Sequence, residues 1–343
     1  MTGRPASPAI LGGLIVCIAA ASLATGSMAA GPTRFSGQAF ADYFYNLDGS
    51  GVVKNDNGFQ FRRIYLTAEH DLSERITSRL TLEADNQALT LNGKSAEFVK
   101  YAYLQFKNVA PGGDLFAGMS STPLWQDAEA VWGYRSVEKT ILDSRGFGTA
   151  SDIGVAMKGV FGQGSPAGYH VMFANGNGQK PENDRSKKGY VAIPIHFRKG
   201  IFEPLADYEG GPGDLDKYTL KALLGWTEDK WAVGLEGFRR TNLDAGPGGD
   251  DATPTGFSLF GRAKFDKGWG GFARFDWYDP NSNDDTAGYR HNYALAGLDF
   301  TPAPDVHVMP NISVENYDGK SSALPDLDKD VVARITVSFN YKD

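Results

Sequence analysis

The strongest constraint in this sequence is a set of sixteen runs in which apolar and polar residues alternate with a period of two. In the last run, Val331, Ala333 and Ile335 share one face, while Arg334 and Thr336 lie on the other. Such alternation is typical of β-strands with one apolar and one polar face. The runs are 35–46, 58–70, 76–85, 96–107, 114–120, 151–161, 168–175, 188–197, 201–209, 217–226, 230–240, 256–265, 269–278, 289–300, 306–316 and 331–341.

The connections between these runs alternate between short and long. Segments 71–75, 227–229 and 266–268 are short, whereas the polar segments 47–57, 86–95, 176–187, 241–255, 279–288 and 317–330 are long. This alternation indicates an antiparallel meander with tight turns at one end, as in transmembrane β-barrels of bacterial outer membranes. Most runs also approach the roughly 9–11 residues that a tilted strand needs to cross the hydrocarbon.

We therefore predict an all-β fold, a 16-stranded antiparallel up-and-down transmembrane β-barrel. In hydrocarbon every backbone N–H and C=O group must be paired within the protein, and only a closed sheet leaves no edge. A barrel of this size leaves an aqueous passage. Counts of 14 or 18 strands stay open, because Pro194 and Pro204 fall within runs 188–197 and 201–209 and remove ladder donors.

A soluble β-sandwich would show the same alternation, with its apolar faces turned into a shared core. The large number of runs without a domain break favours the membrane barrel. So do aromatic residues near the ends of runs, which fit interfacial girdles: Tyr43, Tyr45, Trp226, Trp277, Tyr278, Phe339 and Tyr341.

Residues 1–30 have the features of a secretory signal peptide. Arg4 is followed by an apolar run over 9–21 and by small residues before Gly31. An uncleaved membrane anchor is the alternative, but the apolar run is short for a span. We expect cleavage after Ala29 or Ala30, export through the periplasm, and a single barrel domain over 31–343 in the outer membrane. The only cysteine, Cys17, lies in the segment that would be removed.

The composition argues against several other classes of protein. Without Arg4, the 34 basic residues become 33 against 41 acidic ones, a net charge of −8, which does not favour nucleic-acid binding. None of the five histidines forms a metal-ligand spacing with another histidine or a cysteine, so we expect no metal, no cofactor and no enzymatic activity. Calcium binding by the Asp-rich segments 249–251, 281–285 and 326–330 stays open.

The alternation stops once on a large scale, over residues 121–150. The segment reads STPLWQDAEAVWGYRSVEKTILDSRGFGTA and suggests a short helix instead of a strand. It is the third long connection of the predicted meander. We predict that aromatic and charged residues of this segment face the interior of the barrel: Trp125, Asp127, Glu129, Trp132, Tyr134, Arg135, Glu138, Lys139, Asp143 and Arg145.

The chain resembles the porins of Gram-negative outer membranes, and most of all the phosphate-selective porin O and P family. The resemblance rests on FRRIYLTAEHDL (61–72), RLTLEAD (79–85), KYAYLQ (100–105) and the segment 118–123. It covers most of the chain after residue 30. It implies that the third long loop folds into the lumen and narrows it, and that the protein is a homotrimer in contact with outer-membrane lipid and lipopolysaccharide.

The predicted function is an outer-membrane channel for passive diffusion of ions and small polar solutes. Mixed charges on loop 121–150 and on the lumen wall would set its selectivity. The loop is slightly acidic, so the residues themselves do not support a preference for phosphate. The predicted lumen-wall residues are Arg63, Glu69, Arg79, Glu83, Lys221, Glu236, Arg262, Arg274, Asp276, Asp299, Glu315 and Arg334.

Three alternatives remain at this point. Loop 121–150 could be an exposed surface loop. The barrel could be plugged and act as an adhesin or binding protein, or the chain could be a soluble secreted β protein.

Overall fold

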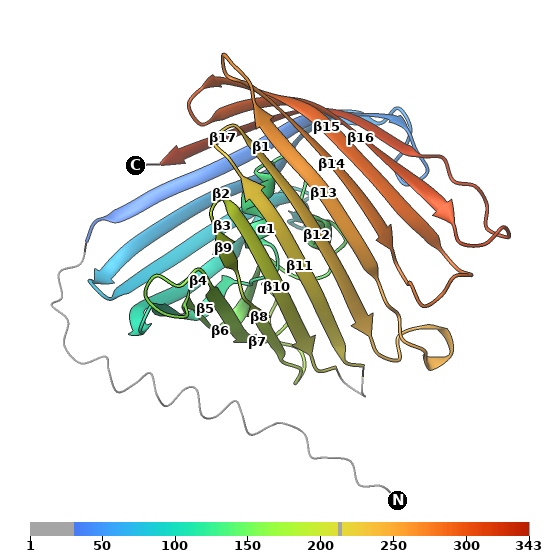
Figure 1. Ribbon diagram of the computed structural model, residues 1–343. Coiled ribbons are helices and arrows are strands. Elements are labelled where there is room, and N and C mark those ends of the chain that lie inside the picture. Colours follow the sequence, from blue (N-terminus) through green and yellow to red (C-terminus); the bar gives the residue numbers. More distant parts are fainter. Residues whose placement is uncertain (1–30, 212–214, 343) are drawn as a thin grey trace, which may run out of the picture.

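The computed structural model describes residues 31–211 and 215–342, which form one closed antiparallel sheet around a central space (Figure 1). Neighbouring strands along the chain pair with one another, and β1 pairs with β17 to close the ring. The predicted signal peptide lies outside the described residues. The strands are β1 (Thr33–Asp48), β2 (Asn57–Ser73), β3 (Ile76–Leu89), β4 (Ser95–Ala110), β5 (Gly113–Ser121), β6 (Ser151–Val160), β7 (Gly168–Ala174), β8 (Lys188–Ala192), β9 (Ile195–Phe197), β10 (Gly200–Glu209), β11 (Lys217–Thr227), β12 (Trp231–Asn242), β13 (Thr255–Lys264), β14 (Trp269–Asp279), β15 (Tyr289–Ala303), β16 (Val306–Gly319) and β17 (Asp330–Lys342).

These segments make sixteen spans, because β8 and β9 are two halves of one strand. Both halves pair with β10, and the break between them falls at Ile193 and Pro194. Pro204 of β10 lies opposite this break: its carbonyl accepts the N–H of Ile193, but it has no N–H to return the second hydrogen bond of the pair. The prediction of a 16-stranded barrel is confirmed, and the two prolines explain the break in this span.

Each strand turns its apolar residues outward. On β12, for example, Trp231, Val233 and Leu235 are exposed, whereas Ala232 and Glu236 between them are buried. This inverts the order of a soluble protein, in which large apolar side chains fill the core. The arrangement suits a barrel whose outer wall contacts lipid and whose inner wall contacts polar groups.

The two ends of the barrel differ in their connections. One end has tight turns, such as the two residues between β2 and β3, and the other has the longer segments, including 122–150. Short turns face the periplasm and long loops the exterior in barrels of this type. In the described part of the chain, no helix is long and apolar enough to cross a membrane.

Hydrogen bonds from a loop secure the seam between the first and last strands. The carboxylate of Asp330, at the start of β17, accepts the backbone N–H groups of Ser50 and Gly51 at 2.8 Å each. Its other oxygen accepts the Tyr317 hydroxyl at 2.5 Å. Closure of the ring is therefore supported by side chains as well as by the β1–β17 ladder.

Candidate functional site

Segment 122–150 lies inside the ring of strands and forms two short helices, α1 (Gln126–Trp132) and α2 (Ile141–Ser144) (Figure 1). Helix α1 contacts β11, β12 and β13 from within the barrel. It ends at Gly133, whose φ of 74° is in the left-handed region that glycine adopts without a steric cost. The third long loop is therefore folded inward instead of lying on the surface.

Apolar side chains attach this loop to one part of the inner wall. The Trp132 ring meets Phe260 and Phe272 edge-on, with centroids 5.7 and 5.9 Å apart. Leu124 and Ile141 of the loop have no solvent-exposed surface. The wall side of this contact comes from strands β5 to β16 and includes Phe116, Ala156, Met172, Ala174, Tyr190, Ala192, Leu205, Leu223, Ala232, Phe238, Phe260, Phe272, Leu295 and Met309. Burial of this size holds the loop in a defined position.

Basic side chains of the wall bind the loop backbone. The Lys221 ammonium donates to the carbonyl of Leu124 at 2.7 Å, and the Arg262 guanidinium donates to the carbonyl of Val131 at 3.1 Å. Arg274 and Arg62 donate to the carbonyls of Lys139 and Val137, respectively. The Val131 carbonyl belongs to the last turn of α1, where helix carbonyls lack partners and the helix dipole favours a cation.

The charged residues of the loop form a compact network. The Arg135 guanidinium pairs with Glu129 at 2.7 Å and with Asp143 at 3.2 Å, and Lys139 pairs with Asp143 at 3.2 Å. Arg145 reaches Glu315 on β16 at 2.7 Å. The network keeps charges of both signs at fixed positions inside the barrel.

Of the other predicted loop residues, Tyr134 and Trp125 contact the wall, whereas Asp127 and Glu138 form no ion pair with it. The Tyr134 hydroxyl donates to Asp299 at 3.0 Å, and Trp125 is buried in the apolar contact described above. Asp127 is half-buried, and neither its carboxylate nor that of Glu138 makes an ion pair within 4.0 Å in the described part of the chain. Glu138 instead accepts the backbone N–H of Lys139.

The two acidic loop residues Glu129 and Glu138 have different electrostatic surroundings. Burial raises the pKa of the Glu129 carboxyl above its ordinary value, although Arg135 opposes the shift. Burial acts in the same direction on Glu138, but Arg62, Arg334 and Arg274 outweigh it and lower the pKa of this carboxyl below its ordinary value. Glu138 therefore keeps its charge to lower pH than Glu129 does.

The predicted lumen-wall residues all lie on the inner strand face, and most are paired. Lys221 sits between Glu203 at 3.2 Å and Glu236 at 3.4 Å, and all three are buried. The other pairs are Arg274 with Asp276 at 2.8 Å, Arg79 with Glu69 at 3.3 Å, Arg334 with Asp42 at 4.0 Å, and Arg63 with Glu83. Asp299 and Glu315 bind the loop residues Tyr134 and Arg145. The wall thus presents ion pairs and not a cluster of one sign.

Sequence reasoning missed the apolar residues of the inner wall. Phe260 has the same strand phase as Ser258 and Arg262, and it was not recognised as a contact for the loop. An aromatic residue on an otherwise polar face was the available signal. Tyr278 was assigned to an interfacial girdle, which is wrong: its ring is buried on the inner side, 5.9 Å from Phe147 of the loop.

Two inward cations, Arg62 and Lys100, were also missed. Arg63 and Tyr101 point inward, so strict alternation would point their preceding neighbours, Arg62 and Lys100, outward. No feature of the sequence signals otherwise.

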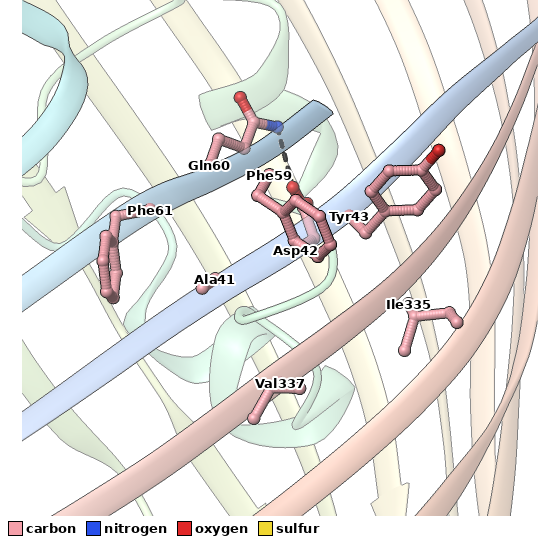
Figure 2. A pocket seen from close by; sticks show the side chains of 8 residues that line it. All are labelled: Ala41, Asp42, Tyr43, Phe59, Gln60, Phe61, Ile335 and Val337. Carbon is pink, nitrogen blue, oxygen red and sulfur yellow. Dashed lines mark hydrogen bonds between the residues drawn. The ribbon is translucent and has the colours of Figure 1, made fainter. Parts of the chain in front are cut away.

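One cavity of the described structure lies in the interior of the barrel, and another lies on its outer surface. One of about 870 Å³ lies at the short-turn end and is lined by loop residues Gly133, Tyr134 and Ser136 together with turn residues such as Lys230 and Lys264. The other, of about 590 Å³, is an apolar groove on the outer surface of β17, β1 and β2 (Figure 2). Its lining includes Phe59, Phe61, Ile335 and Val337. Since this groove faces lipid, only the first cavity belongs to the interior.

No group of three or more histidine, cysteine, aspartate or glutamate residues in the described ranges could hold a metal ion. The tightest charged groups are the ion pairs above, and each already has its partner within the chain. The arrangement supports the passage or exclusion of charged solutes better than it supports bond-breaking chemistry.

Solved structures with the same fold are outer-membrane proteins. The anion-selective porin from Comamonas acidovorans has a TM-score of 0.64 at 12% identity, with 91% of this chain and 100% of that chain covered. The outer membrane channel DcaP of Acinetobacter baumannii has a TM-score of 0.67 at 11% identity, with 92% and 99% covered. Salmonella typhi OmpF, in complex with daunomycin, has a TM-score of 0.63 at 12% identity, with 90% and 97% covered.

No family model matches the sequence, and no curated protein matches it. At such low identity the likeness establishes the fold, a porin-type barrel of sixteen spans. It does not extend to the phosphate-selective family.

Proposed function

We propose that this protein is an outer-membrane channel through which ions and small polar solutes diffuse passively. The observation that carries the proposal is the position of segment 122–150, which is bound inside a closed barrel by Lys221, Arg262 and Arg274. In this proposal, a loop held there reduces the cross-section, and the cavity of about 870 Å³ beside Gly133, Tyr134 and Ser136 is space that it leaves at the short-turn end. The porin-type fold and the apolar outer surface support a location in the outer membrane.

Selectivity would come from the charges at the narrowest level. The loop contributes Asp127, Glu129, Glu138 and Asp143, and Arg135, Lys139 and Arg145 oppose them. The facing wall contributes Arg63, Arg79, Arg334 and their acidic partners. Fixed charges of both signs across a narrow passage create a transverse field, which sorts solutes by charge and dipole. The proposal includes no phosphate specificity and no catalytic step.

The first experiment is conductance of the purified protein in a planar bilayer, with the reversal potential measured across a KCl gradient. We expect stepwise ionic conductance and a weak preference for one ion sign. Absence of conductance above the lipid baseline would contradict the channel and favour the plugged adhesin or binding barrel. Recovery of the protein from cells in buffer without detergent would instead favour the soluble secreted protein.

The homotrimer and the contact with lipopolysaccharide stay predictions. Native mass spectrometry of the detergent-extracted protein measures both. A complex of three chains with retained lipopolysaccharide would support them, and a lipid-free monomer would contradict them.

A further inference from the structure

Two β-bulges lie in the part of the wall that makes the fewest apolar contacts with the loop. In the β1–β2 ladder Phe40 pairs with Arg63 and Ala41 with Phe61, so that Arg62 between them has no partner. In the β3–β4 ladder Thr81 pairs with Tyr101 and Leu82 with Val99, and Lys100 has no partner. A bulge adds one residue to a strand and changes the direction of its side chain. In each case the extra residue carries a positive charge.

The first bulge turns two consecutive arginines inward. Phe61 and Ile64 on either side remain exposed on the outer surface, while Arg62 and Arg63 do not. The Arg62 guanidinium donates to the carbonyl of Ser136 at 3.2 Å and also to the carbonyl of Val137. Arg62 therefore reaches from β2 to the loop between its two helices, on the side away from the apolar contact.

The second bulge places Lys100 on the inner side next to Tyr101. Lys100 is buried, and its ammonium lies 2.7 Å from Glu83 and 4.8 Å from the centre of the Tyr65 ring. Glu83 also pairs with Arg63, which follows the first bulge. The Glu83 carboxylate thus lies between Arg63 and the cation of the second bulge, whereas Arg62 pairs with Asp42 at 3.7 Å.

Regular strands cannot produce this arrangement. With a period of two, the neighbour of an inward residue points to the lipid, where a lysine or arginine near the midplane costs about 2–4 kcal/mol. A bulge lets two successive residues point inward. It adds a cation to the lumen without exposing one to the membrane.

We propose that the bulges at Arg62 and Lys100 are a selectivity device, which adds two cations to the wall facing the acidic residues of the constriction loop and, through Arg62, fixes the position of that loop. The proposal rests on the channel function proposed above. Arg62 lies within electrostatic range of Glu138, and Lys100 within range of Glu129. The bulges would thereby balance the acidic loop and prevent a strong preference for cations.

The test compares Arg62→Met, Lys100→Met and Arg62→Lys with the unmodified protein by reversal potential in a KCl gradient. Lys264→Met is the matched control, because Lys264 is an exposed lysine at the short-turn end of the interior and forms none of the ion pairs of the acidic loop residues Glu129 and Asp143. Loss of either bulge cation should raise the ratio of potassium to chloride permeability about two- to threefold, the effect on both ions of one charge roughly 7 Å away in water when about 0.1 M salt screens roughly half of the interaction. The control should change the ratio by less.

Arg62→Lys separates the two roles of Arg62. It keeps the charge and therefore the ion selectivity, but lysine has one terminal nitrogen and cannot contact the loop carbonyls and the Asp42 carboxylate at the same time, as the Nη1 and Nε atoms of Arg62 do. We expect unchanged reversal potential with larger fluctuations of the open-channel current. Heat-dependent migration on SDS gels shows whether each variant still forms the barrel.

The outcomes distinguish this inference from the proposed function. If the unmodified protein conducts and the bulge variants shift selectivity no more than Lys264→Met does, the inference is wrong and the channel stands. If Arg62→Lys shifts the reversal potential as much as Arg62→Met, the charge of Arg62 is not what matters. If the unmodified protein does not conduct, the channel itself is wrong.

Discussion

The inner wall of the barrel has two sides that treat the constriction loop differently. Strands β5 to β16 meet the loop with apolar side chains, such as Phe260 and Phe272 around Trp132, and with cations that bind its carbonyls. Strands β2 to β4 face it with Arg62, Arg63, Arg79 and Lys100, which are paired with acidic residues. The first side holds the loop mainly by apolar burial, whereas the second contacts it through a polar side chain, Arg62.

This difference shows how a barrel can position a long loop without blocking itself. Apolar contacts on one side displace the loop from the axis, and their stability does not depend on ionic strength. On the other side the Asp42 and Glu83 carboxylates are buried, and the Arg79–Glu69 pair is about one third exposed, so this pair is open to exchange with a passing ion. A loop held equally by both sides would leave no polar path.

The largest expected effect comes from weakening the apolar side. Trp132→Ala removes a fully buried ring from the contact with Phe260 and Phe272 and should destabilise the docked loop by about 3–5 kcal/mol. Hydrogen exchange of loop amides measures this as faster exchange over 126–145. Trp231→Ala, on the outer surface, is the control. Equal exchange in both variants would show that apolar packing does not hold the loop.

A smaller effect is expected from the cations on the same side. Arg262→Gln removes the donor to the Val131 carbonyl at the end of α1 and should cost about 1.5–3 kcal/mol, typical of a hydrogen bond from a charged group. Hydrogen exchange should then increase in α1 and not in α2. If α2 responds equally, the loop is a single cooperative unit and Arg262 does not act locally.

The smallest expected effect is a dependence of ion selectivity on pH, and it concerns the loop residues that face the passage. Because the pKa of the Glu129 carboxyl is raised, Glu129 gains a proton before Glu138 as the pH falls, and the loop loses negative charge. The permeability ratio should shift toward anions by about two- to threefold for this one charge. Reversal potentials measured from neutral to acidic pH test this. Glu129→Gln should abolish the first part of the shift, and Glu138→Gln should leave it in place.

Much of the fold could be predicted from the sequence, because each strand of a membrane barrel must satisfy a local rule. Lipid on one side and water on the other force a period of two, so Val331 to Tyr341 could be assigned to a strand without any contact information. All sixteen runs correspond to spans of the barrel. The loop could be recognised for the same reason, since it is the one long segment that breaks the rule.

The candidate site could be predicted only in part. Charged residues such as Lys221, Arg274 and Glu236 could be placed on the inner face by phase, but their partners could not, because pairing depends on the register between strands. The apolar inner residues escaped prediction, since alternation alone does not reveal that a loop will cover them. Tyr278 was predicted to be interfacial, and Phe238, in phase with Glu236 and Arg240, carried no sign that Phe147 of the loop would pack against it.

By itself, then, the sequence determined the up-and-down order of the strands, the two-faced wall and the existence of one exceptional loop, because these follow from solvent on each side of a strand. Only the tertiary structure decided that the loop lies against β11 to β13 and that Arg62 and Lys100 point inward. A bulge is a mismatch in the number of residues between two paired strands, so it cannot be predicted from the sequence of either strand alone. Which way those two cations face was therefore settled by the pairing of β1 with β2 and of β3 with β4.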